Sequence, residues 1–132
     1  MIRSRTNRKH GVAFVELAVT LPLILLIAFA TIEICSSYYL RQTLKISAYQ
    51  GCRMGITPAG SGELARSQCK MLLEERGVKN YTISLNKEPE TLAENDVFTV
   101  TVSAPFANNI PMSGWIMKSR VVQCSVSMLS ER

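Results

Sequence analysis

Histidine is almost absent from this sequence, and its one histidine, His10, lies in a basic segment at the N-terminus. The motifs of zinc proteolysis (HExxH), serine hydrolysis (GxSxG) and phosphate cradling (GxxxxGKS/T) are absent as well. The four cysteines never occur as CxxC, so no structural zinc site is indicated. We therefore expect a protein that is not an enzyme and that has no catalytic residue, metal site or other cofactor.

Acidic residues are absent before Glu16, whereas basic residues precede an apolar run over residues 12–32, in which Glu16 is the only charge. As a helix with a rise of about 1.5 Å per residue, this run is about 31 Å long, which matches the hydrocarbon thickness of a bilayer. Positive charge favours the cytoplasmic side of a membrane. We therefore expect residues 1–11 to be a cytoplasmic leader, residues 12–32 a transmembrane helix segment and residues 33–132 an exported domain. The basic residues of the leader are Arg3, Arg5, Arg8 and Lys9.

The positive charge is concentrated in the leader. The net charge is +5, but four of the 15 Lys and Arg residues precede Val12, and the others nearly balance the 10 Asp and Glu residues. A domain with balanced charge lacks the basic surface that binds a phosphate backbone. We expect no nucleic acid partner and, without a catalytic motif, no small-molecule substrate.

Helical periodicity continues beyond the apolar run. Neither Gly nor Pro occurs between Leu23 and Gln50. After Glu33, apolar residues recur at mostly helical spacing with polar residues between them. This predicts one helix of about 40 residues whose first half is apolar all round and whose second half is amphipathic. We expect this helix to reach about residue 54 and to end in the glycine-rich stretch 51–62, where Gly51 and Gly55 form a G-x-x-x-G outside the apolar run.

A second, shorter helix is predicted after this stretch. Ser61 fits its N-cap, and Gly77 fits its C-terminal stop. Its apolar stripe needs a partner, either the amphipathic half of the long helix or a sheet. The stripe consists of Ala65, Cys69, Leu72 and Leu73.

Three segments, residues 81–86, 98–103 and 122–128, alternate between apolar and polar side chains as half-buried strands do. The sequence therefore predicts an α+β fold: a long N-terminal helix, a short second helix and a small antiparallel sheet of about three strands. The link over residues 86–96 suits a loose hairpin. The link over residues 104–119 is longer, and its apolar residues either tuck under the sheet or form an exposed contact surface for another subunit. These residues are Phe106, Ile110, Pro111, Met112, Trp115 and Ile116.

All four cysteines follow the apolar run, and three of them, Cys52, Cys69 and Cys124, belong to the exported domain, where disulfides form and persist. Cys69 and Cys124 both fall on inward faces, so this pair is the first candidate disulfide. Cys52 with Cys69 is the alternative, and the spacing does not choose between them. The competing interpretation is that all four, including Cys35, are small buried hydrophobes or free thiols.

Glu16 needs an explanation, because a carboxylate at the centre of a membrane helix costs about 2.5–3.5 kcal/mol and somewhat less near an end. It follows Val12 by one helical turn. A cut after Gly11 creates an ammonium on Val12 that lies near this carboxylate, in the same chain or in a neighbour. Pairing between staggered subunits would fix their axial register. The alternative is a partly solvated Glu16 in the interfacial region, without a partner.

The residues around this junction resemble the processing site of type IV prepilins, in which a basic leader ends in Gly and Glu occupies the fifth mature position. Arg8-Lys9-His10-Gly11 precedes Val12 here, and Glu16 is the fifth residue after the junction. More specifically, the chain resembles the TadE-like pseudopilins of the tight-adherence (Tad, or Flp) pilus system. This resemblance rests on the order of Gly11-Val12-Ala13-Phe14-Val15-Glu16-Leu17-Ala18, Leu21-Pro22, Ile32-Glu33, Tyr39-Leu40-Arg41-Gln42 and Gly51-Cys52-Arg53.

The resemblance implies that a prepilin peptidase removes residues 1–11 by cutting between Gly11 and Val12. It implies a minor pilin or pseudopilin that contributes to the biogenesis or assembly of a Tad/Flp-type pilus. Such a subunit is anchored once in the bacterial inner (cytoplasmic) membrane, with its N-terminus in the cytoplasm and its domain in the periplasm or outside the cell. The implied partners are the peptidase, other pilins or pseudopilins, the Tad assembly machinery and the lipid of the inner membrane.

Two other interpretations stay open. The stretch Ala28-Phe29-Ala30 before Thr31 satisfies the small-x-small rule of signal peptidase, and a cut after Ala30 would release a secreted domain. Glu16 inside the apolar region and the continuous helix across this cut argue against it. The second alternative is an unprocessed single-pass membrane protein.

Overall fold

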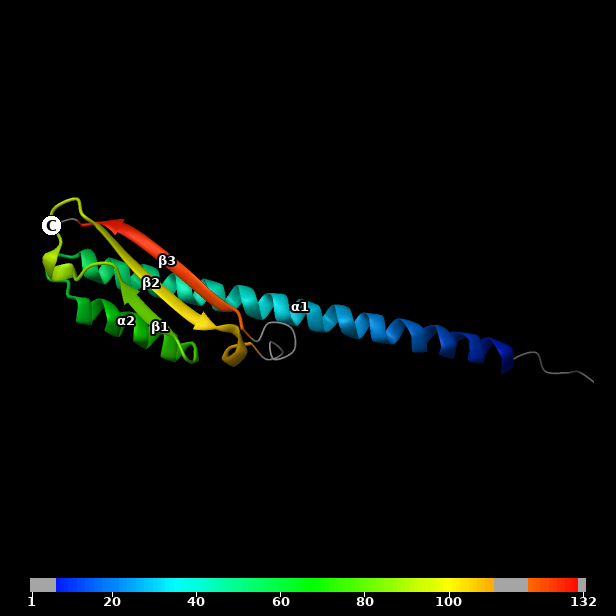
Figure 1. Cartoon of the computed structure of the whole chain (residues 1–132). Helices are drawn as coiled ribbons and strands as arrows, with labels where there is room; N and C mark the ends of the chain where they lie inside the picture. Colours follow the sequence, from blue (N-terminus) through cyan, green and yellow to red (C-terminus); the bar gives the residue numbers. More distant parts are fainter. Residues whose placement is uncertain (1–6, 111–118, 131–132) are drawn as a thin grey trace, which may run out of the picture. The chain divides into compact units, whose positions relative to one another are not determined.

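The computed structural model describes residues 7–110 and 119–130, with side chains from Gly11 onward. The chain divides into two compact units, Met1–Ile34 and Cys35–Arg132. In its described residues, the first unit is helical, and the second combines helix and sheet, as Figure 1 shows. Of the predicted basic leader, residues 1–6 lie outside the described residues, and residues 7–10 are helical.

Helix α1 spans Asn7–Ile56, so it begins earlier than predicted and ends within the predicted stretch 51–62. It starts before the apolar run because Gly11 is tolerated in its second turn. It contains Pro22, whose missing N–H leaves one carbonyl of the preceding turn without its usual donor. It ends at Ile56 because Pro58 restricts Thr57 to extended backbone.

Glycines Gly51 and Gly55 do not end α1, contrary to the expectation from the glycine-rich stretch. Both lie in its last two turns and are buried. A Cβ at Gly51 would overlap the Cys69 Sγ, and a Cβ at Gly55 would overlap the Phe98 ring. These positions lack a side chain because the second helix and the sheet approach α1 there.

Helix α2 spans Gly62–Glu75, as predicted. The Ser61 Oγ accepts a hydrogen bond from the Leu64 backbone N–H at 3.1 Å, which makes Ser61 the N-cap. Gly77 has a φ of 69°, the left-handed conformation that ends a helix with little strain for glycine. The predicted apolar stripe is buried at Ala65, Cys69 and Leu73, and it is half-buried at Leu72.

The three predicted strands are confirmed as one antiparallel sheet in the order β1-β2-β3. The strands are β1 (Thr82–Leu85), β2 (Val97–Pro105) and β3 (Val121–Leu129). On β2, every second side chain is buried, and the intervening Thr99 and Thr101 lie on the other face. Their hydroxyls hydrogen-bond to Ser127 and Ser125 on β3 at 2.8 and 2.9 Å. Such cross-strand pairs hold β2 and β3 in register.

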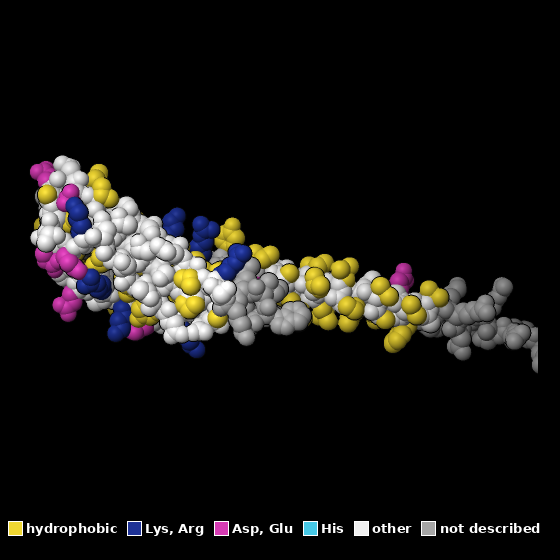
Figure 2. Space-filling view, viewed as in Figure 1, with side chains coloured by type: hydrophobic (Ala, Val, Ile, Leu, Met, Phe, Trp, Pro, Cys, Tyr) yellow, Lys and Arg dark blue, Asp and Glu magenta, His cyan; other side chains and the backbone are white. Residues whose placement is uncertain are grey.

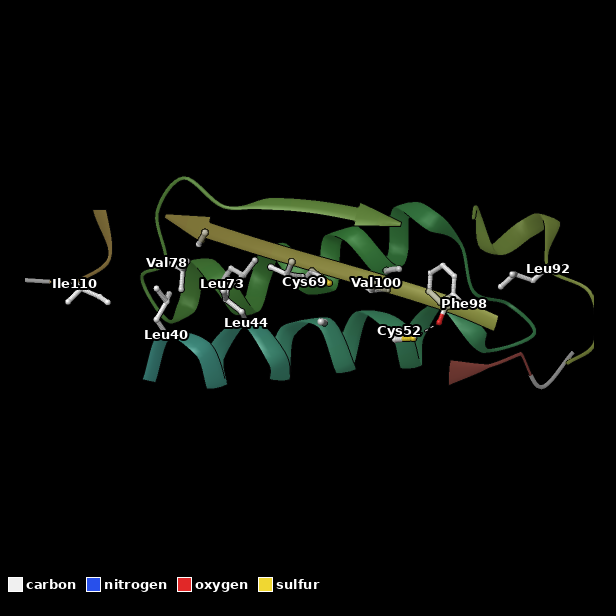
Figure 3. Packing of buried hydrophobic residues seen from close by; sticks show 14 residues of the cluster. Leu40, Leu44, Cys52, Cys69, Leu73, Val78, Leu92, Phe98, Val100 and Ile110 are labelled. Carbon is white, nitrogen blue, oxygen red and sulfur yellow. Dashed lines mark hydrogen bonds between the residues drawn. The ribbon is translucent and has the colours of Figure 1, made fainter. Parts of the chain in front are cut away.

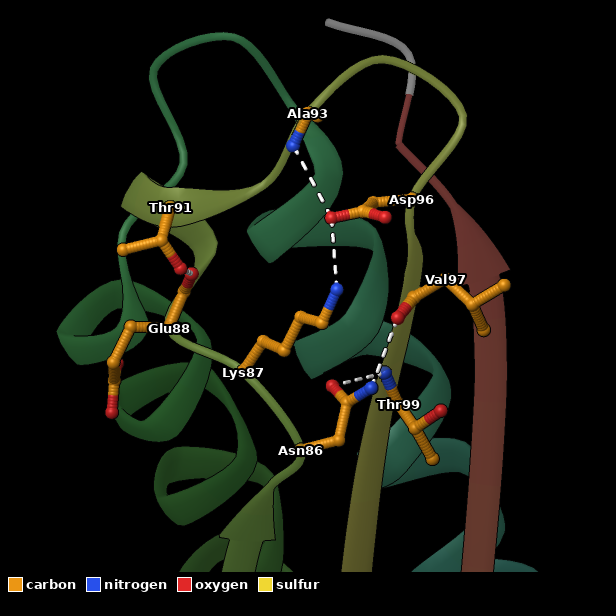
Figure 4. Close-up of polar contacts among 8 residues, drawn as sticks. All are labelled: Asn86, Lys87, Glu88, Thr91, Ala93, Asp96, Val97 and Thr99. Carbon is orange, nitrogen blue, oxygen red and sulfur yellow. Dashed lines mark hydrogen bonds and ion pairs between the residues drawn. The ribbon is translucent and has the colours of Figure 1, made fainter.

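The link between β1 and β2 is a hairpin closed by polar contacts and interrupted by the short 3-10 helix η1 (Pro89–Thr91). Asn86 donates to the Val97 carbonyl at 2.9 Å and accepts from the Thr99 N–H at 2.8 Å (Figure 4). The Lys87 Nζ lies 2.9 Å from a carboxylate oxygen of Asp96. The two Asn86 bonds satisfy backbone groups where the ladder stops, and the ion pair links the two sides of the hairpin.

The core lies between the Cys35–Ile56 part of α1, helix α2 and one face of the sheet (Figure 3). From α1, Leu40 and Leu44 are buried, one helical turn apart, and they belong to one cluster with Leu73 of α2. From the sheet, Phe98 and Val100 of β2 have no exposed surface. Two helices on one face of a small sheet form one hydrophobic layer, which is the predicted α+β arrangement.

The apolar link after β2 is described only in its first part. Phe106 belongs to the 3-10 helix η2 (Phe106–Asn108) and is half-buried, while Ile110 is buried with 5% of its surface exposed. This first part of the link packs inward, in agreement with the expectation of an apolar link that tucks under the sheet. The remaining apolar residues of the link, Pro111, Met112, Trp115 and Ile116, lie outside the described residues.

Candidate processing and assembly site

The first part of α1 exposes hydrophobic side chains on all sides. Val12, Phe14 and Val19 each expose about two thirds or more of their surface, at 67%, 72% and 71%. Figure 2 shows hydrophobic side chains along the face of this stretch that is in view. Its mean hydropathy is 2.5, and among the described residues α1 is the one helix that is long and apolar enough to span a membrane. Such a surface is stable in lipid or against other apolar helices, but not in water.

The predicted processing site lies inside this helix. Gly11 has open space around the position of a side chain, and Val12 is exposed. Neither residue is covered by the rest of the described chain, so an external protein has access to the junction. Since proteases bind extended backbone, cleavage there requires the first turns of α1 to open, and helix ends fray readily.

Glu16 is exposed on the same helix, one turn after Val12. Its backbone carbonyl accepts a hydrogen bond from the Thr20 hydroxyl at 3.0 Å. Among the described residues, the ion pairs do not include the Glu16 carboxylate. The partner for this charge therefore has to come from water, lipid headgroups, a neighbouring subunit or a new N-terminus at Val12, and the two interpretations of Glu16 stay predictions.

Neither candidate disulfide is formed in the structure, where all four cysteines are free thiols. The Cys69 Sγ donates to the Ser47 carbonyl at 3.3 Å, the Cys52 Sγ to the Phe98 carbonyl at 3.4 Å and the Cys124 Sγ to the Arg41 carbonyl at 3.6 Å. Cys69 and Cys124 thus contact α1 at carbonyls almost two turns apart. Sequence spacing could not show this, because it depends on how α2 and β3 pack on α1.

Burial makes two of these thiols weak acids. It raises the pKa of the Cys52 thiol to about 11, and it also raises the pKa of the Cys69 thiol. Since the thiolate is the nucleophile and the metal ligand, both groups are unreactive near neutral pH. In the described part of the chain, no group of three His, Cys, Asp or Glu residues could hold a metal ion.

The structure brings together two arginines, Arg41, which the sequence analysis named only as part of Tyr39-Leu40-Arg41-Gln42, and Arg120, which it did not name. Arg41 of α1 and Arg120, which precedes β3, line one hollow of about 440 Å³ with Tyr38 and Phe106. Only the packing of β3 beside α1 joins residues so far apart in the sequence. No pattern in the sequence joins them, because Arg41 lies within α1 and Arg120 directly precedes β3.

Comparison with known proteins finds a family that matches part of the chain. The family described as TadE-like protein matches residues 11–53, from the predicted processing glycine to Arg53. This confirms the predicted resemblance over that stretch. No curated protein and no solved structure matches the chain.

Proposed function

We propose that this chain, which is TadE-like over residues 11–53, is a minor pilin or pseudopilin of a Tad-type pilus. The observation that carries the proposal is the position of Gly11, Val12 and Glu16 at the start of an exposed apolar helix within the matched residues. In this account, a prepilin peptidase cuts after Gly11, and the mature subunit begins at Val12. The chain is a substrate and a structural part of the assembly rather than its catalyst.

The anchor of the mature subunit is the first part of α1. One long apolar helix near the N-terminus fits a single-pass membrane protein. The basic leader favours a cytoplasmic N-terminus in the inner membrane and an α+β domain on the opposite side. There the domain is available to other pilins or pseudopilins and to the assembly machinery.

The continuity of α1 supports this over a secreted domain. The helix runs through Ala30 and Thr31, and the Thr31 hydroxyl donates to the Ile27 carbonyl at 2.8 Å. A cut after Ala30 would break α1 in its middle. The donor and the acceptor of that hydrogen bond would then lie in different fragments. A signal peptide also gains nothing from Glu16 in its apolar region.

Glu16 has a defined task in this account. The α-amino group of Val12 is mostly protonated at pH 7, because N-terminal amines titrate near pH 8. Between helices that exclude water, an ammonium and a carboxylate attract strongly, and an unpaired one is costly. Pairing Glu16 of one subunit with the amine of another therefore selects one axial stagger between neighbouring helices.

Replacing Glu16 with Val tests the proposal. The Glu16→Val protein should stay in the membrane after alkaline carbonate extraction, because the change removes a charge from the apolar run. Its recovery with an epitope-tagged pilus subunit should fall by about tenfold or more. Glu16→Asp keeps the charge and should retain part of that recovery.

Thr20→Val is the matched control for this experiment, since it also replaces a polar residue of the apolar run with Val. It removes only the two hydrogen bonds of the Thr20 hydroxyl to the Glu16 and Leu17 backbone carbonyls, leaves the Glu16 carboxylate in place and should leave recovery unchanged. If Glu16→Val co-purifies with the pilus subunit as well as the Thr20→Val control does, Glu16 does not set the register of assembly.

A further inference from the structure

The exported domain has two adjoining hollows between α1 and β3, with volumes of about 440 and 430 Å³. They share Tyr38, Arg41 and Gln123. Arg120 completes the first hollow, and Lys45 completes the second. Figure 2 shows Lys and Arg side chains grouped along the upper edge of the domain in this view.

The backbone holds both arginines in place. The Arg41 carbonyl accepts the Cys124 thiol at 3.6 Å, which ties α1 to β3. The Arg120 carbonyl accepts the Phe106 N–H at 3.0 Å, which ties the start of β3 to η2. The hollow is therefore a fixed feature of the packed domain, although the guanidinium groups themselves are exposed.

The charge of these hollows is not neutralised by the described residues. No acidic residue lines either hollow, and the described ion pairs use other cations. Near η1, by contrast, acids are matched: Arg66 pairs with Glu88 at 2.6 Å and Lys87 with Asp96 at 2.9 Å. An exposed, unmatched group of cations around a concave surface favours an anionic ligand.

The position of Arg41 in the chain indicates which anion is near. It follows the apolar run by nine residues of α1, which is about 14 Å of helix. A cation that follows a membrane-spanning segment this closely in the chain is attracted to anionic lipid headgroups. Tyr38, with 65% of its surface exposed, is of the type that concentrates at membrane interfaces.

We propose that the hollow lined by Arg41 and Arg120 binds the phosphate of an anionic membrane phospholipid. The lipid, rather than free phosphate, fits the lining, because Tyr38 and Phe106 provide an apolar wall beside the two cations. Bidentate arginine contacts suit a phosphate diester. The inference rests on the proposed membrane anchoring and gives the anchored subunit a second, headgroup-specific contact with the bilayer before it assembles.

Native mass spectrometry of the full chain in detergent tests this, with dioleoylphosphatidylglycerol and dioleoylphosphatidylcholine as probes. We expect the wild-type chain to retain phosphatidylglycerol over phosphatidylcholine, because the choline cation is repelled by the arginines. Arg41→Gln with Arg120→Gln should lower this retention by about fivefold for each arginine and about 25-fold together. Arg53→Gln with Arg76→Gln is the control, since it removes the same charge from two exposed arginines outside the hollow.

A second variant keeps the arginines. Gln123→Glu places an acid in both hollows and should also lower phosphatidylglycerol retention, while leaving the circular dichroism spectrum of the chain unchanged. Equal retention of the two lipids, or equal losses in the test and control pairs, would overturn the proposal. Displacement of the lipid by equimolar inorganic phosphate would show a free-anion site instead. None of these outcomes alters the N-terminal residue or the Glu16→Val result, so failure here is separate from failure of the proposed function.

Discussion

The contact between Gly51 and Cys69 shows how one missing side chain sets the distance between two helices. Gly51 is buried, and a Cβ there would overlap the Cys69 Sγ and lie 3.1 Å from the Ala65 carbonyl oxygen. Because that carbonyl belongs to helix backbone, it cannot move aside as a flexible side chain would. The interface therefore requires glycine at this position.

Gly51→Ala should destabilise the domain by about 1–3 kcal/mol, since overpacking outweighs the better helix propensity of alanine. Urea unfolding of the full chain in detergent measures this. Cys69→Ala removes the atom in conflict, so the double variant should lose less stability than the two single variants combined. Strict additivity would mean that the two residues do not press on each other.

The Cys52 thiol is predicted to be inert in the folded protein. Its pKa near 11 is raised by burial, so the reactive thiolate forms only as the pH approaches 11, and at pH 8 about one thiol in a thousand is ionised. With reductant removed just before iodoacetamide is added, peptide mass spectrometry should find exposed Cys35 alkylated at least about 100-fold faster than Cys52. The Cys52 rate should rise about tenfold per pH unit from 8 to 10. Equal rates for the two cysteines in the folded protein would contradict its burial.

At the scale of elements, α2 depends on its N-cap. The Ser61 hydroxyl satisfies the Leu64 N–H, one of the donors that a helix start leaves free. Ser61→Ala should therefore lower the free energy of unfolding by about 1 kcal/mol, measured by urea unfolding in detergent. Ser67→Ala in the middle of α2 is the control and should change stability little. A loss at Ser67 as large as that at Ser61 would argue against capping.

Local sequence patterns predicted helices and strands well where residues close in the sequence determine the structure. The alternation of Phe98, Val100 and Val102 gave β2, and Ser61 with Gly77 bounded α2. The end of α1 was less predictable, because Gly51 and Gly55 are breakers by composition but are needed for close packing here. Propensity at these two glycines was overridden by tertiary contacts.

The candidate site divides in the same way. Gly11, Val12 and Glu16 are adjacent along one helix, so their spacing alone placed them together. The contact of Cys124 with α1 and the shared hollow of Arg41 and Arg120 depend on how β3 lies beside α1. No local sequence pattern encodes that packing. The predicted pairing of Cys69 with Cys124 used only inward-facing positions, and facing inward does not bring two residues into contact.

At the scale of the whole molecule, the chain combines an apolar helix segment that the other described residues do not cover with an α+β domain that has its own core. A secreted domain has no use for the first feature, and an ordinary anchor has no use for Glu16 beside a glycine junction. Both features follow if the chain is a precursor whose cut end becomes part of a helix assembly.

The N-terminal residue of the protein purified from membranes tests this account most directly. Intact mass and end sequencing, in cells with and without the prepilin peptidase, identify it. The account predicts Val12 when the peptidase is present and Met1 when it is absent. Met1 in both strains would leave an unprocessed anchor, and Thr31 would show a secreted domain, so either result would contradict the account.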